Sequence, residues 1–501
     1  MQQDHPPVDK IRPRVVFFYP VKGSSAGKEN LRKHFSFQIN HLEWKVEDFY
    51  RKEGTDMGDI LIEILLGIGR LFLHPLTYIF VAALLWFHIS RVKRERKDFH
   101  TRVHDVVSTI LTPIPKGLIV GVIVSAAVIL IGIELPYAII PLITLIWLVQ
   151  MPFRQMRWYS LTVTLSVILL LLPFLPAGGT GVAFVDGWLS DLNEVNLLSL
   201  GTLLVLLLIA ESVLVLLDGA AQSSPALRKS PRGKIVGEHI VSRAWILPVA
   251  LLFPAGSLSS IDWWPLMGWN SETFGLMLLP FMLGFQTKVQ SYYPEEAASM
   301  LGRRMMLLAV ASAGLLAASF YFSGVIYFVA AFVLIGREWI CVAFDIGDKR
   351  RTRLFTAREN GLTVVDILPK STAEKMDIRT GETIVKVNGR KVETQREFYD
   401  GLQQNSAFAK LEVIDHAGEK RFAQASVYEN DHYLIGCLFV PDDEGVNLSL
   451  KGLRSSVVVH EDRRNVRDLE QKALAGKKEP VPQLEAPEER KEIKEEAESL
   501  K

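Results

Sequence analysis

The stretch GETIVKVNGRKV at residues 381–392 decides the fold of the carboxy-terminal part of this chain. Apolar and polar residues alternate in TIVKV, as they do along a half-buried β-strand. The pair Asn388-Gly389 follows and favours the type I′ turn that joins two antiparallel strands. The stretch therefore predicts a β-hairpin of a water-soluble unit, although apolar residues dominate positions 58–336 before it.

The sequence on both sides of this hairpin continues the pattern of a small α+β unit. GLTVVDIL at 361–368 alternates as a strand, and STAEKM at 371–376 has the spacing of a capping box that starts a short helix. A second helix is expected at 394–404 and another hairpin at 410–427. This order predicts a small, partly open barrel at residues 361–440.

Composition separates the chain into apolar and charged parts. Of its 501 residues, 49% are hydrophobic and 22% are charged, but the two classes do not alternate as they do in amphipathic elements. This separation predicts a membrane region at 57–340. The formal charge of +1 and the lack of a basic stripe argue against nucleic-acid binding. Two cysteines, Cys341 and Cys437, are too few for a disulfide framework or a cysteine metal site, and no cofactor is expected.

The apolar part predicts about eight spans, with roughly six to nine possible, because about 20 apolar residues cross the hydrocarbon core. The candidate segments are 71–89, 117–133, 135–151, 159–175, 197–217, 244–258, 273–285 and 305–336. The last run is broken at 321–324 and is long enough for two short helices. The fold class expected is therefore an all-α multi-span membrane region followed by a small β-rich α+β domain.

Lys and Arg in short loops set the expected orientation, because positive charge is retained on the cytoplasmic side. The basic loops are 91–102, 153–157, 227–234, 303–304 and 348–353. Their alternation with acidic or basic-poor stretches places everything after Arg337 in the cytoplasm. Residues 341–360 are then a basic linker next to the membrane.

Ionisable residues within the apolar segments are candidates for function, because charge in a membrane is costly. They are Glu211, Asp218, His74 and Glu338. Only Glu211 is expected to lie deep, and no partner for it is evident. A packing hydrogen bond is favoured over a transport site, since no pair of broken spans indicates inverted repeats.

Both ends of the chain are polar. The basic residues of 1–56 would lie outside the cell if the first span delivers 91–102 to the cytoplasm, and RKEG at 51–54 can be encoded as a ribosome-binding sequence. We therefore hypothesise that translation begins at Met57; the alternative is a cytoplasmic tail before an in-plane helix or an extra crossing. Residues 441–501 are expected to form a charged, largely disordered tail.

GLTVVDILPKSTAEKMDIRTGETIVKVNGRKV at 361–392 resembles the PDZ domains associated with bacterial proteases. Asp377 and Glu382 stand where that family usually has Gly and Asp, and both replacements are conservative for the fold. The resemblance implies a module that adds an extended peptide as a strand beside a helix and holds a terminal carboxylate with backbone N–H groups.

In the permuted arrangement of these domains, the groove strand would be YLIGCLF at 433–439, facing the helix at 394–404. The implied peptide-binding residues are Tyr433, Leu434, Ile435, Gly436, Phe398 and Leu402. Alternatively, the same residues only close the edge of the barrel and bind nothing.

Protease signatures are missing, so an enzyme is not expected. His460-Glu461 lacks the second His of the zinc-binding HExxH pattern. Ser323-Gly324 lacks both the preceding glycine of a membrane serine nucleophile and a nearby intramembrane His.

LIEILLGIGRLFLHPLTY at 61–78, the basic RVKRERKDF at 91–99, several spans and one PDZ domain together resemble the MinJ family of cell-division topology proteins of rod-shaped Gram-positive bacteria. The resemblance covers about residues 57–440 and implies a non-enzymatic scaffold in the cell membrane, enriched at septa and poles. The partners it implies are membrane lipid, a DivIVA-like polar scaffold, a MinD-like division inhibitor and the division machinery. Tethering the module at the membrane would strengthen weak peptide contacts.

Two other functions stay open. The chain could regulate a separate protease by binding peptides, in which case its deletion would change cleavage of a membrane substrate and leave septum placement intact. It could also be a transporter with a regulatory PDZ domain, and its activity would then need Glu211.

Overall fold

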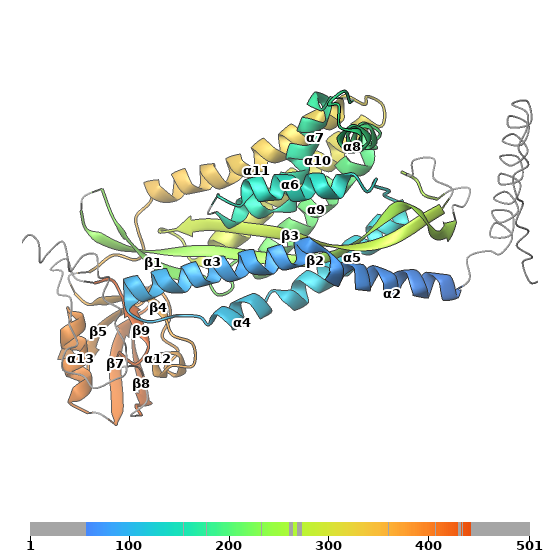
Figure 1. Cartoon of the computed structure of the whole chain (residues 1–501). Coiled ribbons are helices and arrows are strands. Elements are labelled where there is room, and N and C mark those ends of the chain that lie inside the picture. The colour runs from blue at the N-terminus through green and yellow to red at the C-terminus, as the bar shows by residue number, and fades with distance from the viewer. Residues whose placement is uncertain are drawn as a thin grey trace, which may run out of the picture. The chain divides into compact units, whose positions relative to one another are not determined.

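The computed structural model describes residues 57–441 except 154, 177, 232, 260–263, 268–272, 359, 406, 429–431 and 433. The hypothesis about residues 1–56 and the prediction of a charged tail therefore lie outside the described residues. Two parts follow one another in the described chain: an apolar region, residues 57–350, and a carboxy-terminal module, residues 361–441 (Figure 1).

Helices make up most of the apolar region. They are α2 (Met57–Leu73), α3 (Pro75–Phe99), α4 (Val106–Leu111), α5 (Ile114–Ile131), α6 (Ile139–Gln150), η1 (Met156–Tyr159), α7 (Leu161–Leu171), η2 (Leu172–Phe174), α8 (Ala183–Asn193), α9 (Leu197–Asp218), α10 (Pro294–Ser319) and α11 (Val325–Arg350).

Among the described residues, five helical segments are long and apolar enough to cross a membrane: α3, the α4–α5 segment, α9, α10 and α11. The predicted break at 321–324 falls between α10 and α11. Helices α6 and α7, in the predicted spans 135–151 and 159–175, are shorter. Helix α11 continues to Arg350, so the linker predicted to begin at 341 is helical as far as that residue.

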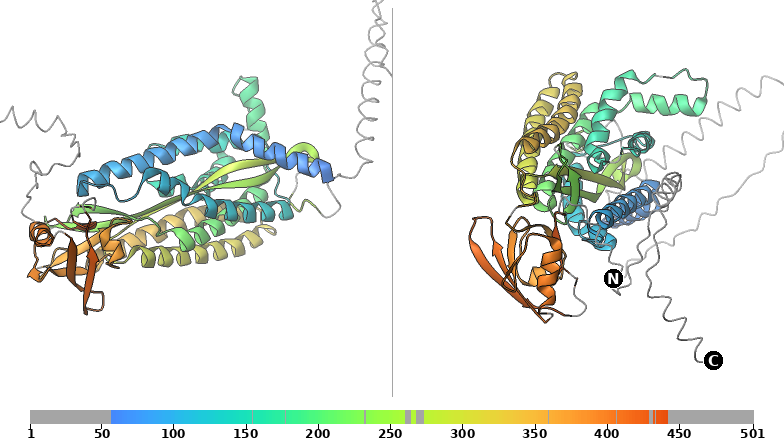
Figure 2. Two further views of the ribbon diagram at one scale, coloured as in Figure 1. Left: turned by 90° about the horizontal axis from the view of Figure 1, so that it is seen from below. Right: turned by 90° about the vertical axis from the view of Figure 1, so that its left-hand side faces the viewer.

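The prediction of helical spans at 244–258 and 273–285 is wrong. These segments belong to strands β2 (Ile235–Ser259) and β3 (Thr273–Val289), a long antiparallel hairpin. In its register Pro248 lies opposite Pro280, and a proline at either position would break a helix. Strand β1 (Ser224–Lys229) pairs with β2 near one end. Figures 1 and 2 show the hairpin as a layer between the α2–α5 helices and helices α9–α11.

Helix α5 covers the outer backbone edge of β2. A Cβ on Gly117 or Gly121 would lie 2.6 Å or 2.9 Å from a β2 carbonyl oxygen, so these glycines permit close approach. One turn further on, Ser125 Oγ donates to Pro248 O at 3.3 Å and accepts from Ala250 N–H at 2.9 Å. Four helical residues rise about 6.0 Å and two strand residues about 6.6 Å, so the two periods match. Pro248 itself has no N–H, so this position of the edge presents only its carbonyl oxygen.

Side chains cover the outer edge of β3. Arg70 of α2 donates from Nη1 to Leu276 O at 2.9 Å, and Arg337 of α11 donates from Nη2 to Gly284 O at 2.9 Å. Non-helical backbone is tolerated at membrane depth only where protein surrounds it. The coverage of β2 and β3 meets this condition.

The groove strand expected at 433–439 is shorter in the structure, Cys437–Phe439, because residues 434–436 form a turn before it. The module otherwise contains the elements that the sequence predicts. They are β4 (Leu362–Ile367), α12 (Thr372–Lys375), β5 (Thr383–Val387), β6 (Arg390–Lys391), α13 (Gln395–Gln403), β7 (Phe408–Ile414), β8 (Lys420–Ser426) and β9 (Cys437–Phe439). The antiparallel sheet has the order β8-β7-β5-β4-β9, with β6 paired to β5. Asn388 and Gly389 have φ of 48° and 87°, which confirms the predicted turn.

Candidate peptide groove and buried ion pairs

Helix α13 supplies one side of the predicted groove. Its start is fixed by a capping box in which Thr394 Oγ1 accepts from Glu397 N–H and the Glu397 carboxylate accepts from Thr394 N–H. Phe398 and Leu402 lie on the same face, one turn apart, and both are buried. The helix is held to the sheet because Asn388 Nδ2 donates to Gly401 O at 2.9 Å.

Strand β9 supplies the other side. It is the last strand of its sheet and, among the described strands, it pairs only with β4. The ring of Phe439 meets the ring of Phe398 edge-on, with 4.9 Å between centroids. The module therefore places an edge strand beside a helix, which is the geometry that strand addition of a peptide requires.

The loop before β9 is closed by its own hydrogen bonds. Ile435 N–H donates to His432 O at 2.7 Å, and Cys437 N–H donates to Leu434 O at 3.0 Å. Ile435 and Gly436 both have positive φ, 51° and 94°, and a Cβ on Gly436 would lie 2.2 Å from Ser371 Cβ. Glycine is therefore required at 436, and two loop amides that a carboxylate would need are engaged within the loop.

The predicted groove residues that the structure describes share one core. Phe398, Leu402, Leu434 and Ile435 all belong to the hydrophobic cluster that fills the module. Tyr433 lies outside the described residues. These side chains close the barrel whether or not a peptide binds.

Burial sets the protonation of the groove loop. It lowers the pKa of His432 to about 4, so the ring is neutral at neutral pH. His432 Nδ1 accepts from Leu434 N–H at 3.2 Å, a bond that only the unprotonated nitrogen can make. Burial also raises the pKa of the Cys437 thiol, which keeps that group uncharged.

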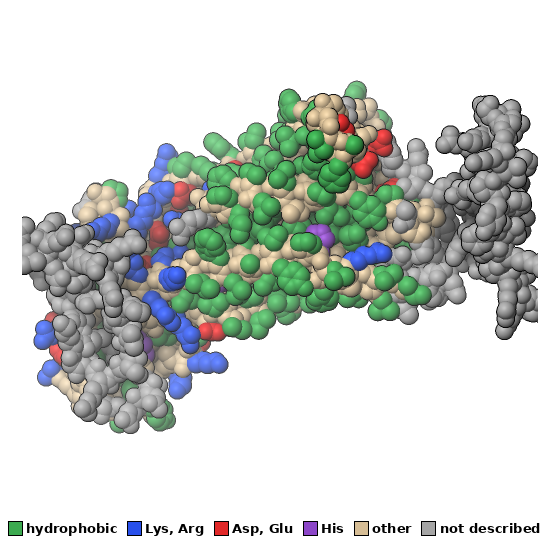
Figure 3. Space-filling model, in the orientation of Figure 1, with side chains coloured by type: hydrophobic (Ala, Val, Ile, Leu, Met, Phe, Trp, Pro, Cys, Tyr) green, Lys and Arg blue, Asp and Glu red, His purple; other side chains and the backbone are tan. Residues whose placement is uncertain are grey.

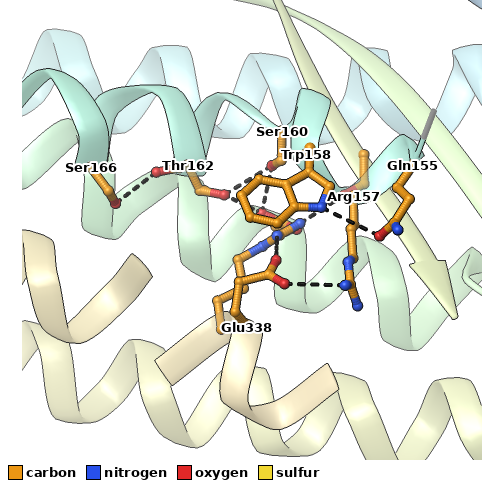
Figure 4. A network of polar contacts seen from close by, with 10 residues as sticks. Gln155, Arg157, Trp158, Ser160, Thr162, Ser166 and Glu338 are labelled. Atoms are coloured by element: carbon orange, nitrogen blue, oxygen red, sulfur yellow. Dashed lines mark hydrogen bonds and ion pairs between the residues drawn. The ribbon is translucent and has the colours of Figure 1, made fainter. Parts of the chain in front are cut away.

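Glu211, for which the sequence shows no partner, lies in a polar network in which protein donors contact both carboxylate oxygens. Ser160 and Thr162 of this network are labelled in Figure 4. Glu211 Oε1 accepts from Arg337 Nη2 at 2.5 Å and Nε at 3.0 Å. Its Oε2 accepts from Ser160 Oγ at 2.7 Å and Thr162 Oγ1 at 2.6 Å. Arg337 also lies 3.4 Å from Glu338. The network joins α7, α9 and α11, and both oxygens of Glu211 are occupied by protein donors.

The other ionisable candidates also have protein partners. Asp218 accepts from Arg243 at 3.2 Å, Trp245 Nε1 at 2.9 Å and Lys116 Nζ at 2.5 Å. His74 caps α3 by accepting from Leu76 N–H, and Glu338 pairs with Arg157 at 3.4 Å (Figure 4). These contacts join neighbouring elements of the apolar region. In the network around Glu211, the carboxylates of Glu211 and Glu338 both have protein partners on their two oxygens.

Sequence reasoning missed Arg337 as the partner of Glu211. The sequence indicates a last span that ends at 336, just before Arg337. Helix α11 continues beyond this residue, and the Arg337 side chain is almost fully buried. The signal was present, since Arg337 precedes Glu338 within a continuous apolar helix. Only the pairing of α9 with α11 identifies the partner, and that contact is distant in sequence.

Basic side chains gather at one end of the apolar region. On the face drawn in Figure 3, hydrophobic side chains cover the helices and most Lys and Arg side chains lie toward the end that carries the carboxyl end of α3. Lys93, Arg96 and Lys97 of α3 are exposed there. Segregation of this kind is typical of a membrane protein with its basic end in the cytoplasm.

The chain is similar over about three quarters of its length to three cell-division proteins. It is 34% identical over 392 residues to the cell division topological determinant MinJ of Bacillus subtilis (strain 168), covering 76% of this chain and 96% of that protein. It is 22% identical over 397 residues to probable cell division topological determinants MinJ of Lacticaseibacillus paracasei and Lacticaseibacillus casei (strain BD-II), covering 75% of this chain and 99% of each relative. No protein-family model matches the chain.

Proposed function

The chain belongs to the family of the cell division topological determinant MinJ, and from this premise we propose that it is a non-enzymatic membrane scaffold that helps to select the division site. The observation that carries this proposal is the 34% identity to the Bacillus subtilis protein over 96% of that protein's length. A match of this extent includes much more than a single common module.

The module acts in this proposal as a PDZ-type peptide-binding unit. The edge strand β9 beside α13 supports this role, because a partner segment could extend the sheet there. The residues proposed to contact it are Tyr433, Leu434, Ile435, Gly436, Phe398 and Leu402. The closed loop before β9 must open its amides if the partner ends in a carboxylate at this site.

The proposed location is the cell membrane, with the module in the cytoplasm and enrichment at septa and poles. Five candidate spans and the basic end of the apolar region support this orientation. The proposed partners are membrane lipid, a DivIVA-like polar scaffold, a MinD-like division inhibitor and the division machinery. A transporter is disfavoured, since protein donors occupy both oxygens of Glu211.

Imaging in living cells tests this function. A fluorescent fusion of the full chain is expressed in rod-shaped Gram-positive cells that lack the native gene. We expect bands at septa and young poles, and restored septum placement in cells that otherwise form minicells or filaments. Uniform membrane label without restored placement would contradict the proposal. Altered cleavage of a membrane substrate with normal septa would instead favour the protease regulator.

A further inference from the structure

The register between β4 and β9 depends on one extra residue in β4. Val364 pairs with Phe439 and Asp366 pairs with Leu438, so Val365 is a β-bulge opposite the groove strand. A bulged residue falls out of the ladder and its polar groups need other partners. Val365 is fully buried, so water does not reach it.

The partner of the bulge comes from the apolar region. His239 of β2 places Nε2 2.8 Å from Val365 O, and a carbonyl can only accept, so Nε2–H is the donor. The ring is fixed on its other side, because Nδ1 lies 3.1 Å from Ser223 Oγ. It also lies 5.0 Å from the ring of Phe355. His239 is 1% exposed, so this bond is shielded from water.

Apolar packing also holds β9 against the Val365 bulge and the apolar region. Leu438 and Val440, on the outer face of the β9 segment, share a buried cluster with Val365, with Phe99 at the carboxyl end of α3 and with Val103 in the loop after it. Cys437 and Phe439 lie in the module core. The short strand β9 is therefore held between the module core on one face and the apolar region on the other.

We infer that His239 is a positioning residue for the peptide groove, acting through the Val365 bulge to set and hold the register of β9. The role of His239 in peptide binding rests on the proposed function, whereas its contact with Val365 is a feature of the structure. The apolar region thereby helps to position the strand that binds the ligand, in addition to anchoring the module. The groove strand is thus complete only in the full chain.

The two cysteines of the chain make a direct test possible. Cys437 lies in β9 and Cys341 lies in α11, and both are buried as free thiols. Local opening of β9 exposes Cys437 alone, whereas global unfolding exposes both. The full chain in lipid vesicles is treated with N-ethylmaleimide, and mass spectrometry of its peptides gives a separate rate for each thiol.

His239→Leu removes the donor and leaves a buried carbonyl unpaired. We expect Cys437 to react about tenfold faster or more, with the Cys341 rate unchanged. His239→Gln, which can present an amide N–H toward Val365 O, should restore most of the protection. Phe99→Ala, which loosens the packing without orphaning a polar group, should give a smaller selective rise.

Ser125→Ala is the matched control, since it weakens a contact of β2 that does not touch the module. It should leave the Cys437 rate unchanged. Three outcomes would overturn the inference: a wild-type Cys437 rate in His239→Leu, an equal rise at Cys341, or no recovery in His239→Gln. Because the assay contains no peptide, these outcomes are independent of whether the groove binds a division partner.

Discussion

The hairpin β2–β3 and the strand β9 expose the same kind of backbone edge to different surroundings. In the apolar region, α5 covers β2 and two arginine side chains reach carbonyls on β3. In the module, β9 ends its sheet and has a helix beside it, without a further described strand. A strand edge facing lipid must be covered by protein, whereas one facing water can remain available for a partner.

The largest expected effect comes from a substitution next to the covered hairpin β2–β3. Arg337→Leu leaves the carboxylate of Glu211 buried without its charge partner and removes a donor to Gly284 O. We expect a loss of about 3–5 kcal/mol in the free energy of unfolding. Thermal unfolding of the purified chain in detergent measures it.

Two variants define the cause of that loss. The double variant Glu211→Gln with Arg337→Leu should be more stable than Arg337→Leu, because no unpaired charge remains buried. Arg157→Leu, at a partly exposed ion pair, should cost much less. Equal losses for Arg337→Leu and Arg157→Leu would contradict the importance of the buried pair.

Gly436→Ala tests the groove loop. The substitution forces Ala into a φ of 94° and places its Cβ 2.2 Å from Ser371 Cβ. We expect a cost of about 2–3 kcal/mol from strain and overlap together. Gly389→Ala is matched, since its φ is 87° but no atom lies within 4 Å of the added Cβ. If denaturant unfolding of the full chain gives equal losses, the contact with Ser371 is unimportant.

Gly121→Ala tests the cover on β2. Its Cβ would lie 2.9 Å from Pro248 O, so α5 must move away from the strand. We expect a cost of about 1–2 kcal/mol. Gly314→Ala in α10 meets nothing within 4 Å and should be neutral or slightly stabilising. Thermal unfolding measures the stability of both variants. Equal stabilities would mean that close packing of α5 on β2 is unimportant.

Local sequence signals predicted the module well and the hairpin poorly. Alternation, the helix cap at Ser371 and the pair Asn388-Gly389 are short-range features, and each appears in the structure where the sequence predicts it. A continuous apolar run does not distinguish a buried strand from a helix. The useful signs were Pro248 and Pro280, which a helix tolerates poorly and which the strands place opposite each other.

In the candidate site, too, the sequence predicted the local elements but not the contacts between distant segments. The sequence pointed to α13 and β9, and the structure brings Phe398 and Phe439 into contact. It did not reveal the contact of His239 with the Val365 bulge or the pairing of Glu211 with Arg337. These contacts join segments far apart in the chain, so no local periodicity reports them.

The smallest expected effect is a pH dependence of the groove loop. The pKa of His432 is about 4 in the folded loop and near its ordinary 6.5 when unfolded, so the unfolded loop takes up the proton first. Loop stability is therefore full above about pH 6.5 and falls as the pH drops toward 4. Amide exchange at Leu434, corrected for intrinsic rates, should quicken by about pH 5.5. His432→Asn should abolish this dependence, and an unchanged one would assign it to another group.

In the proposed function, the edge of β9 takes up a segment of a division partner. The most direct measurement is hydrogen exchange of the full chain in lipid vesicles, with and without the purified DivIVA-like scaffold or MinD-like inhibitor. We expect new amide protection at residues 434–439 and unchanged protection along the covered hairpin at 241–253. Binding that protects other segments and leaves 434–439 unchanged would contradict it.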